Sequence, residues 1–207
     1  MSRTAHEAGY ESLSGFGEAL KQLAGESPTA AADAPIVTVT RIPTPLGPLV
    51  AGVTNGAIVL LEYADRRMLP TQFKRLSKAL RCVFVPGEDP LLTELASQLE
   101  AYFAGERADF DLPLRTSGTD FQERVWEALR AIPPGTTRSY GDVARTIGQP
   151  TAVRAVARAN GDNRIAILIP CHRVIGSDGK LTGYGGGLWR KKRLLEIEAA
   201  AVQTELV

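Results

Sequence analysis

Hydrophobic residues repeat with a helical period near the N-terminus and with a strand-like pattern after residue 35. In residues 13–25, leucine and phenylalanine recur at helical spacing, which predicts one short amphipathic helix. The Ala/Pro-rich tract of residues 27–35 is typical of a linker. The runs at 36–40, 49–53 and 57–63 are rich in β-branched and aliphatic residues, which predicts three short strands.

Turn and helix signals extend this strand-rich region. Asn55-Gly56 lies between two apolar runs and predicts a hairpin. We expect an exposed helix over residues 70–80 and a strand over residues 82–85 that buries Cys82. One face of a further helix is marked by Leu91, Leu95, Leu99, Tyr102 and Phe103. Residues 36–114 are therefore predicted to form a small α/β unit.

After residue 114 the pattern becomes helical. Thr119 opens a capping-box pattern for a helix over residues 120–132. Ser139 is placed to cap a short helix over residues 140–147, and a second short helix is expected over residues 151–160 after a Gly-containing turn. Two short helices across such a turn are typical of a helix-turn-helix, although tightly packed core helices would give the same pattern.

Composition limits the possible classes of protein. The chain has 207 residues, 44% of them hydrophobic, which is enough for a real core. Two cysteines exclude a disulfide scaffold. With only two histidines in addition, we expect no Cys/His structural zinc site and no bound metal. No apolar run approaches the roughly 18 residues of a spanning helix, and residues 1–10 are too polar for a secretory signal. These features predict a cytoplasmic protein without a membrane partner.

Charge is distributed unevenly between the two halves. The net charge is +1, but residues 1–114 carry 10 basic and 14 acidic side chains, whereas residues 115–207 carry 14 basic and 9 acidic ones. A basic C-terminal half can bind the phosphates of a nucleic acid electrostatically. An ordinary solvated surface of mixed charge would have the same composition. Arg154 and Arg158 lie four residues apart on a predicted helix rich in alanine, which would let DNA approach closely.

The residues with the clearest chemical potential are Cys171 and His172, which follow an apolar run and Pro170. A thiol there should be buried, and burial makes a thiol inert unless a cation, a base or a helix N-terminus offsets it. His172 and Arg173 are candidates for that offset. Neighbours in a strand point to opposite faces, so His172 can serve Cys171 only if the chain turns or a water relays the proton. A purely structural Cys-His pair is the alternative.

The C-terminal part adds a glycine-rich loop and a final helix. The loop, residues 176–187, lacks the strand and helix context of a dinucleotide fingerprint and is expected to pack against a ligand or another backbone. The helix, over residues 188–200, carries a basic run at 190–193 that we expect to be solvated. Glu198 is the candidate carboxylate for orienting His172.

These residues resemble the signature of one known family. Ile169-Pro-Cys-His-Arg-Val174, preceded by the segment 140–163 and followed by Gly183-Tyr-Gly-Gly-Gly-Leu188, is similar to the motifs of the O6-alkylguanine-DNA alkyltransferases, also called methylated-DNA–protein-cysteine methyltransferases. The resemblance covers residues 36–200 and is strongest from Phe121 onward.

The resemblance implies a fold and a reaction. Residues 36–114 would form a ribonuclease-H-like α/β domain, and residues 115–207 an α-helical catalytic domain with a winged-helix-like helix-turn-helix. The implied reaction is irreversible, single-turnover transfer of an alkyl group from O6-alkylguanine, and from O4-alkylthymine, to a cysteine. It implies duplex DNA as the partner, with the damaged nucleotide flipped out from the minor-groove side, a monomeric protein and no cofactor.

Roles follow position by position from the same resemblance. Cys171 resembles the acceptor, His172 the base that acts through a bound water, and Glu198 the orienting carboxylate. Tyr140 resembles the residue that contacts the flipped nucleotide's backbone and donates a proton to the leaving guanine. Arg154 resembles the finger that fills the space the base vacates. The other implied DNA contacts are Ala152, Ala155 and Arg158, and the other implied pocket residues are Asn163 as hinge, Val174, Tyr184 as wall, Gly185 and Lys191.

Position 185 departs from the pattern of some family members, which have serine after the tyrosine. Gly185 leaves only a backbone N–H for a contact to guanine O6, and we expect the missing side chain to widen the pocket or to alter the preference among alkyl groups.

The N-terminal residues 1–35 carry a second resemblance. Residues 9–28 are similar to a fragment of an AraC-type regulator's DNA-binding domain. The partner helix and zinc-binding cysteines of such domains are not in this sequence, so we expect a vestige or a docking helix.

Three other functions stay open on the sequence. A non-catalytic alkyltransferase-like protein would recruit other repair factors, but a cysteine at the acceptor position favours catalysis. A transcriptional regulator would need a complete N-terminal DNA-binding unit. A cysteine hydrolase would need an oxyanion motif, and the sequence shows no separate one.

Overall fold

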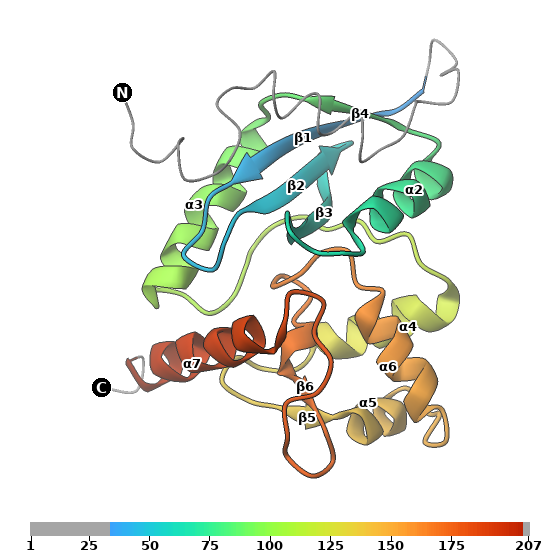
Figure 1. Ribbon diagram of the computed structural model, residues 1–207, viewed down its shortest axis with the longest axis vertical. Coiled ribbons are helices and arrows are strands. Elements are labelled where there is room, and N and C mark those ends of the chain that lie inside the picture. The colour runs from blue at the N-terminus through green and yellow to red at the C-terminus, as the bar shows by residue number, and fades with distance from the viewer. Residues whose placement is uncertain (1–33, 205–207) are drawn as a thin grey trace.

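The computed structural model describes residues 34–204, with a four-stranded sheet in one half and a group of helices in the other (Figure 1). The helix expected in residues 13–25, and with it the AraC-like fragment, lies outside the described residues. The elements of the first half are, in chain order, β1 (Ile36–Ile42), β2 (Leu49–Thr54), β3 (Ala57–Tyr63), α2 (Leu69–Leu80), β4 (Val83–Pro86) and α3 (Pro90–Ala104).

The sheet has the strand order β3-β2-β1-β4. β1 pairs antiparallel with β2 and parallel with β4, and β2 pairs antiparallel with β3. Asn55 and Gly56 have φ values of 50° and 68° and join β2 to β3, as a two-residue turn of this kind requires. The predicted hairpin is confirmed.

The two helices of this half cover opposite faces of the sheet. Phe73 and Leu76 of α2 pack with Val37 and Val39 of β1, so α2 is not the exposed helix that its polar composition predicted. Lys74 and Lys78 lie on its exposed side, whereas Gln72 is buried. Across the sheet, Leu92, Leu95, Leu99 and Tyr102 of α3 are buried against the other face.

The second half is mainly helical. Its elements are α4 (Asp120–Arg130), β5 (Arg138–Ser139), α5 (Tyr140–Thr146), α6 (Val153–Gly161), the 3₁₀ turn η2 (Cys171–Arg173), β6 (Val174–Ile175) and α7 (Leu188–Thr204). Both predicted caps are present, because Thr119 accepts from the Gln122 N–H at 3.3 Å and Ser139 accepts from the Asp142 N–H at 3.1 Å.

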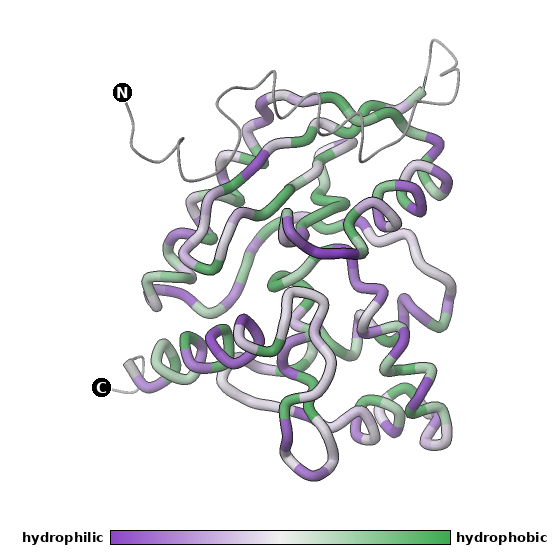
Figure 2. The backbone as a smooth tube through the Cα atoms, in the orientation of Figure 1, coloured by the Kyte–Doolittle hydropathy of each residue, from purple (hydrophilic) through white to green (hydrophobic). Residues whose placement is uncertain are grey.

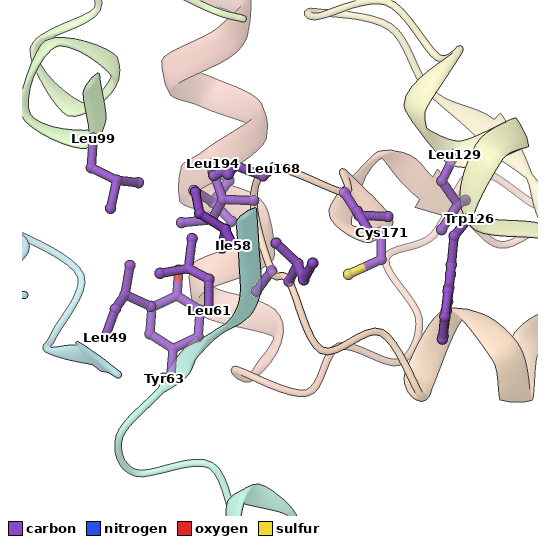
Figure 3. Close-up of a cluster of buried hydrophobic side chains, with 14 of the residues drawn as sticks. Leu49, Ile58, Leu61, Tyr63, Leu99, Trp126, Leu129, Leu168, Cys171 and Leu194 are labelled. Carbon is purple, nitrogen blue, oxygen red and sulfur yellow. The ribbon is translucent and has the colours of Figure 1, made fainter. Parts of the chain in front are cut away.

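The larger apolar core is shared by the two halves, and a smaller apolar cluster lies between α2 and the sheet. Figure 3 shows Ile58 and Leu61 of β3 on one side of Cys171, and Trp126 and Leu129 of α4 on the other. The backbone continues this connection, since Leu61 N–H donates to Arg164 O at 2.8 Å and Ala166 N–H donates to Leu61 O at 2.7 Å. The segment that precedes Cys171 is therefore fastened to the sheet.

Hydropathy along the backbone agrees with this arrangement. Figure 2 shows hydrophobic residues concentrated along the strands, while α7 alternates between hydrophobic and hydrophilic positions. Within residues 34–204, no helix combines the length and the hydropathy needed to cross a bilayer.

Candidate active site

A cavity of about 360 Å³ lies at the junction of the two halves. It joins the end of β3, the C-terminal end of α6 and the glycine-rich loop before α7. The residues that line it are Glu62, Arg66, Tyr140, Ala157, Asn160, Gly161, Asn163, Ala166, Cys171, Thr182, Gly183, Tyr184, Gly185 and Gly186. Four predicted pocket or catalytic residues besides Cys171 are among them, namely Tyr140, Asn163, Tyr184 and Gly185.

The chain turns sharply before Cys171. The apolar run at residues 165–169 is a series of turns and not a strand, and Ile167 has a φ of 72°. Cys171, His172 and Arg173 then form a single 3₁₀ turn. Since this geometry replaces the two-fold alternation of a strand, the turn that sequence reasoning required for a Cys-His partnership is present.

Two asparagines hold the thiol and its backbone. Asn163 donates from Nδ2 to Ile169 O at 2.9 Å and to Cys171 Sγ at 3.2 Å, while its Oδ1 accepts from Ile165 N–H at 2.9 Å. Asn160 donates from Nδ2 to Cys171 O at 3.4 Å. Asn163 thus bridges the end of α6 to the turn that carries the cysteine.

The Cys171 thiol is buried, with 6% of the residue exposed. Burial raises its pKa, and the hydrogen bond from Asn163 and the positive charges of Arg66 and Lys191 oppose that rise. Because the raised pKa prevails, the resting thiol is protonated at neutral pH. Nucleophilic attack by Cys171 therefore requires a base that takes its proton.

His172 is fully buried and contacts Glu198 through Nε2 at 2.7 Å from Oε1. The pKa of Glu198 is lowered to about 2 despite burial, because His172 and Arg173 stabilise its charged form. An ionised carboxylate only accepts hydrogen bonds, so Nε2 carries the proton and Nδ1 is the basic nitrogen. Burial lowers the pKa of His172 itself, which favours the neutral ring.

Nδ1 of His172 is buried and has no hydrogen-bond partner in the described residues. A neutral imidazole with an unpaired acceptor nitrogen, in the residue next to the thiol, has the properties of a general base. The ring also lies edge-on to Tyr184, with centroids 6.5 Å apart.

Arg173 does not offset the burial of the thiol as the sequence suggested. Its Nε and Nη2 each donate to Glu198 at 2.9 Å, and Nη1 donates to Ile132 O at 2.5 Å. Tyr102 donates its hydroxyl to Glu198 Oε1 at 3.0 Å. Arg173 therefore stabilises the carboxylate that is hydrogen-bonded to His172.

The basic run at the start of α7 is only partly solvated, which corrects the expectation of a wholly exposed face. Lys191 is fully buried and donates from Nζ to the carbonyls of Val174 at 2.5 Å and Thr182 at 2.7 Å. Burial lowers its pKa to about 8. Lys191 and Val174 support the pocket from behind and are not among the residues that line it.

Arg190 is the second buried member of this run. It pairs with Asp65 at 2.8 Å, donates to Leu46 O at 2.7 Å and stacks over the Tyr63 ring at 4.2 Å. Since these partners belong to the sheet half, Arg190 fastens α7 to it. The pattern of four consecutive basic residues gave no indication of which two would be buried.

The space beside Gly185 is occupied, so the expected widening of the pocket at this position is wrong. A Cβ atom at residue 185 would lie 2.6 Å from Cζ of Arg66. The guanidinium of Arg66 fills the place that a side chain would take. Sequence reasoning missed Arg66 because it comes from the first half of the chain, far from every motif around Cys171.

The remaining predicted residues lie on the outer face of α6. Arg154, Ala155 and Arg158 are exposed, and Ala152 just before the helix is half-buried. Ala157 of the same helix lines the cavity. Because residues three apart share a helix face, Arg154 lies on the same side of α6 as Ala157, and Arg158 on the same side as Gly161, and both of these residues line the cavity.

Tyr140 lies at the start of α5, at the edge of the same cavity. Its hydroxyl donates to Thr182 O at 3.4 Å, and burial raises its pKa. In the part of the chain that the structure covers, no three His, Cys, Asp or Glu side chains are grouped so that they could hold a metal ion.

Two family profiles match this chain. Residues 120–200 match "6-O-methylguanine DNA methyltransferase, DNA binding domain", and residues 72–116 match "6-O-methylguanine DNA methyltransferase, ribonuclease-like domain". Together the two ranges cover more than half of the chain.

Individual proteins agree with these profiles. The methylated-DNA–protein-cysteine methyltransferase of Mycobacterium bovis is 47% identical over 166 residues, which are 80% of this chain and 94% of that protein. The Methanosarcina acetivorans protein of the same name is 45% identical over 162 residues, 76% of this chain and 95% of the relative. The crystal structure of Mycobacterium tuberculosis OGT in complex with DNA has a TM-score of 0.68 and 46% identity, covering 80% of this chain and 94% of that one.

The buried, ionised carboxylate of Glu198 is expected to contribute to the free energy of unfolding. Replacing Glu198 by Gln leaves the buried Arg173 without its counter-charge, so Glu198→Gln should lose about 3 kcal/mol of unfolding free energy at pH 7. The pKa of this carboxylate is lower in the folded protein than its ordinary 4.5, so its contribution is present above pH 4.5 and disappears as the pH falls through about 2. The difference between the two proteins should therefore shrink on acidification, as measured by denaturant unfolding at several pH values.

The control for this prediction is Glu196→Gln, because Glu196 is exposed on the same helix. It should change stability by less than about 1 kcal/mol at any pH. Parallel stability curves for Glu198→Gln and the unmodified protein between pH 7 and 3 would contradict the assigned ionisation state.

Proposed function

Because this chain belongs to the methylated-DNA–protein-cysteine methyltransferase family, we propose that Cys171 is the thiol that receives the alkyl group. The activity of the chain is direct-reversal DNA repair, in which an alkyl group moves from DNA to a cysteine of the protein. Of the two cysteines, Cys171 lines the cavity, whereas Cys82 is packed in the separate apolar cluster under α2.

This proposal rests above all on the hydrogen bond between His172, the residue next to Cys171, and Glu198. The ionised carboxylate fixes the proton on Nε2, and Nδ1 is left as an unpaired acceptor. A water between Nδ1 and Cys171 Sγ would take the thiol proton to His172, in the way that a positioned base activates a nucleophile. A buried, protonated thiol at rest is then no obstacle to the reaction.

The proposed transfer step is a nucleophilic displacement at the alkyl carbon. The thiol proton passes to His172, and the Sγ electron pair forms a bond to the alkyl carbon. The bond between that carbon and guanine O6 breaks, and its electron pair stays on the guanine, which takes up a proton donated by Tyr140. The thioether on Cys171 has no leaving group for a return step, so each molecule would react once.

DNA recognition is assigned to the helix pair α5 and α6. We read this pair as a winged-helix-like helix-turn-helix, with β5 and β6 beside it. Arg154 and Arg158 are exposed next to the cavity mouth, and the small side chains of Ala152 and Ala155 would let a minor groove approach α6. The damaged nucleotide would be flipped into the cavity, with Arg154 filling the gap in the stack.

We assign a different part in recognising the flipped base to each of several residues in or behind the cavity. Tyr184 would form the wall against the base, and the backbone N–H of Gly185 would face its O6. Asn163 would act as the hinge between α6 and the cysteine turn. Val174 and Lys191 would support the glycine-rich loop from behind. O4-alkylthymine is proposed as a second substrate of the same site.

Three wider features belong to the same proposal. The chain would divide into a segment of residues 1–35, a ribonuclease-H-like domain over residues 36–114 and a catalytic domain over residues 115–207. The relative from Mycobacterium tuberculosis has been crystallised in complex with DNA, which supports DNA as the partner, and we propose that this partner is duplex DNA containing O6-alkylguanine. We also propose that the protein acts as a monomer in the cytoplasm.

Replacing Cys171 by Ala tests the acceptor. Cys171→Ala should abolish loss of the methyl group from a duplex containing O6-methylguanine, because no nucleophile remains, while the dissociation constant for that duplex stays within about threefold. The measurements are chromatography of the digested DNA and fluorescence anisotropy. Cys82→Ala is the matched control and should retain transfer. Transfer by Cys171→Ala, or joint loss of binding and transfer, would contradict the role of Cys171 as acceptor.

Replacing Arg154 by Ala tests whether this side chain fills the gap that the flipped base leaves in the stack. Arg154→Ala should slow transfer from duplex DNA by about tenfold or more, because the cost of unstacking is no longer compensated, and should change transfer from the free base by less than about twofold. Single-turnover rates on both substrates provide the comparison. Arg130→Ala, an exposed change at the end of α4, is the control. Equal losses on duplex and free base would exclude this role for Arg154.

A further inference from the structure

Arg66 connects the two halves of the molecule at the cavity. It follows β3, and its Nη2 donates to Gly161 O at 2.6 Å while its Nη1 donates to Asn163 O at 3.2 Å. Nη1 also pairs with the buried carboxylate of Glu62. Only 8% of the Arg66 side chain is exposed. The guanidinium therefore holds the C-terminal end of α6 in place through two carbonyls, where a positive charge is also favoured by the helix dipole.

The turn that Arg66 holds is the one that positions the thiol. Asn163 accepts from Arg66 through its backbone and donates through its side chain to Cys171 Sγ at 3.2 Å. Gln72 of α2 donates to the same carbonyl at 3.5 Å, and Arg75 pairs with Asp162 at 2.6 Å. Three side chains of the sheet half, those of Arg66, Gln72 and Arg75, therefore hold the segment Gly161–Asn163.

Gly185 is sterically matched to Arg66. A Cβ at residue 185 would lie 2.6 Å from both Cζ and Nε of Arg66, and 2.9 Å from Nη2. The backbone of Gly185 is not in the left-handed region, so alanine is excluded there only by this contact. A free arginine end could move aside, but this guanidinium is pinned by Glu62, Gly161 and Asn163.

We propose that Arg66 is a positioning residue of the alkyl-transfer site, which holds the Gly161–Asn163 turn so that Asn163 reaches the Cys171 thiol, and which requires glycine at position 185. This inference rests on the proposed role of Cys171 as acceptor. It assigns to the sheet half a direct part in preparing the thiol, and it gives a reason for the absence of a side chain at residue 185.

The charge of Arg66 acts in the same direction as its hydrogen bonds. A nearby cation favours a thiolate, and Arg66 and Lys191 are the two cations that lower the pKa of Cys171 against the effect of burial. The pKa shifts of His172, Tyr63, Tyr140 and Tyr184 favour their neutral forms, and the carboxylate of Glu62, which lines the same cavity, is paired with Arg66. The charged groups around Arg66 itself are Glu62, Asp162 and Arg75.

The first test is the pH dependence of Cys171 reactivity toward iodoacetamide, followed by peptide mapping so that Cys82 is scored separately. Arg66→Met should move the inflection for Cys171 upward by about one pH unit, because the thiolate loses a neighbouring cation. Arg66→Lys keeps the charge but not the paired hydrogen bonds, and should shift it less. Arg67→Met, at the exposed neighbouring position, is the control and should not shift it.

The second test is a double-variant cycle on the single-turnover rate of methyl transfer. Gly185→Ala should slow the unmodified protein by about tenfold, because the new Cβ displaces the guanidinium, and should slow the Arg66→Met protein by less than about twofold. Additive losses, or an unchanged inflection in Arg66→Met, would overturn the proposal.

The two tests separate this inference from the proposed function. If the unmodified protein failed to transfer methyl groups, the acceptor role of Cys171 would fail. Iodoacetamide labelling would still report whether Arg66 and Gly185 control the thiol, because that reaction does not depend on DNA repair. A Gly185→Ala protein that folds with its melting temperature unchanged, yet shows the upward shift for Cys171, would support the inference without any variant at Arg66.

Discussion

The buried carboxylate of Glu198 is the group on which the rest of the site depends. It accepts hydrogen bonds from His172, Arg173 and Tyr102, and from the backbone N–H of Gly135 at 3.4 Å, so it joins α7 to three other parts of the chain. A buried charge is tolerated only when it is paired and fully hydrogen-bonded, and here each bond also has a chemical consequence. The ionised state of Glu198 determines the tautomer of His172, and the tautomer determines which nitrogen can serve the thiol.

The position of the cysteine follows from the shared core of the two halves. Cys171 lies among apolar residues of both the sheet and α4, so its thiol is kept from water and stays protonated at rest. Burial alone would make it inert. The base, the hydrogen bond from Asn163 and the cation of Arg66 each come from a different segment, and they converge because β3 is hydrogen-bonded to the turn before the cysteine. Reactivity is thus a property of the assembled molecule.

Much of this could be predicted from the sequence, because its signals are local. The Asn55-Gly56 hairpin and the Thr119 and Ser139 caps depend on residues a few positions apart, and all three were found. The pairing of His172 with Glu198 followed from a family resemblance that is specific in this region. The predictions that failed depended on distant packing. The burial of Lys191 is decided by carbonyls of another loop, and the space at Gly185 is filled by Arg66 from the first half of the chain.

One measurement addresses the proposed role of Cys171 as the acceptor of a single, irreversible transfer. Intact mass measurement with peptide mapping, after incubation with a duplex containing one O6-methylguanine, tests it most directly. We expect one added methyl group per molecule, located on the peptide that contains Cys171, with no further increase when excess duplex is supplied. Tight binding of the duplex without any change in mass, or a methyl group on a different residue, would contradict it.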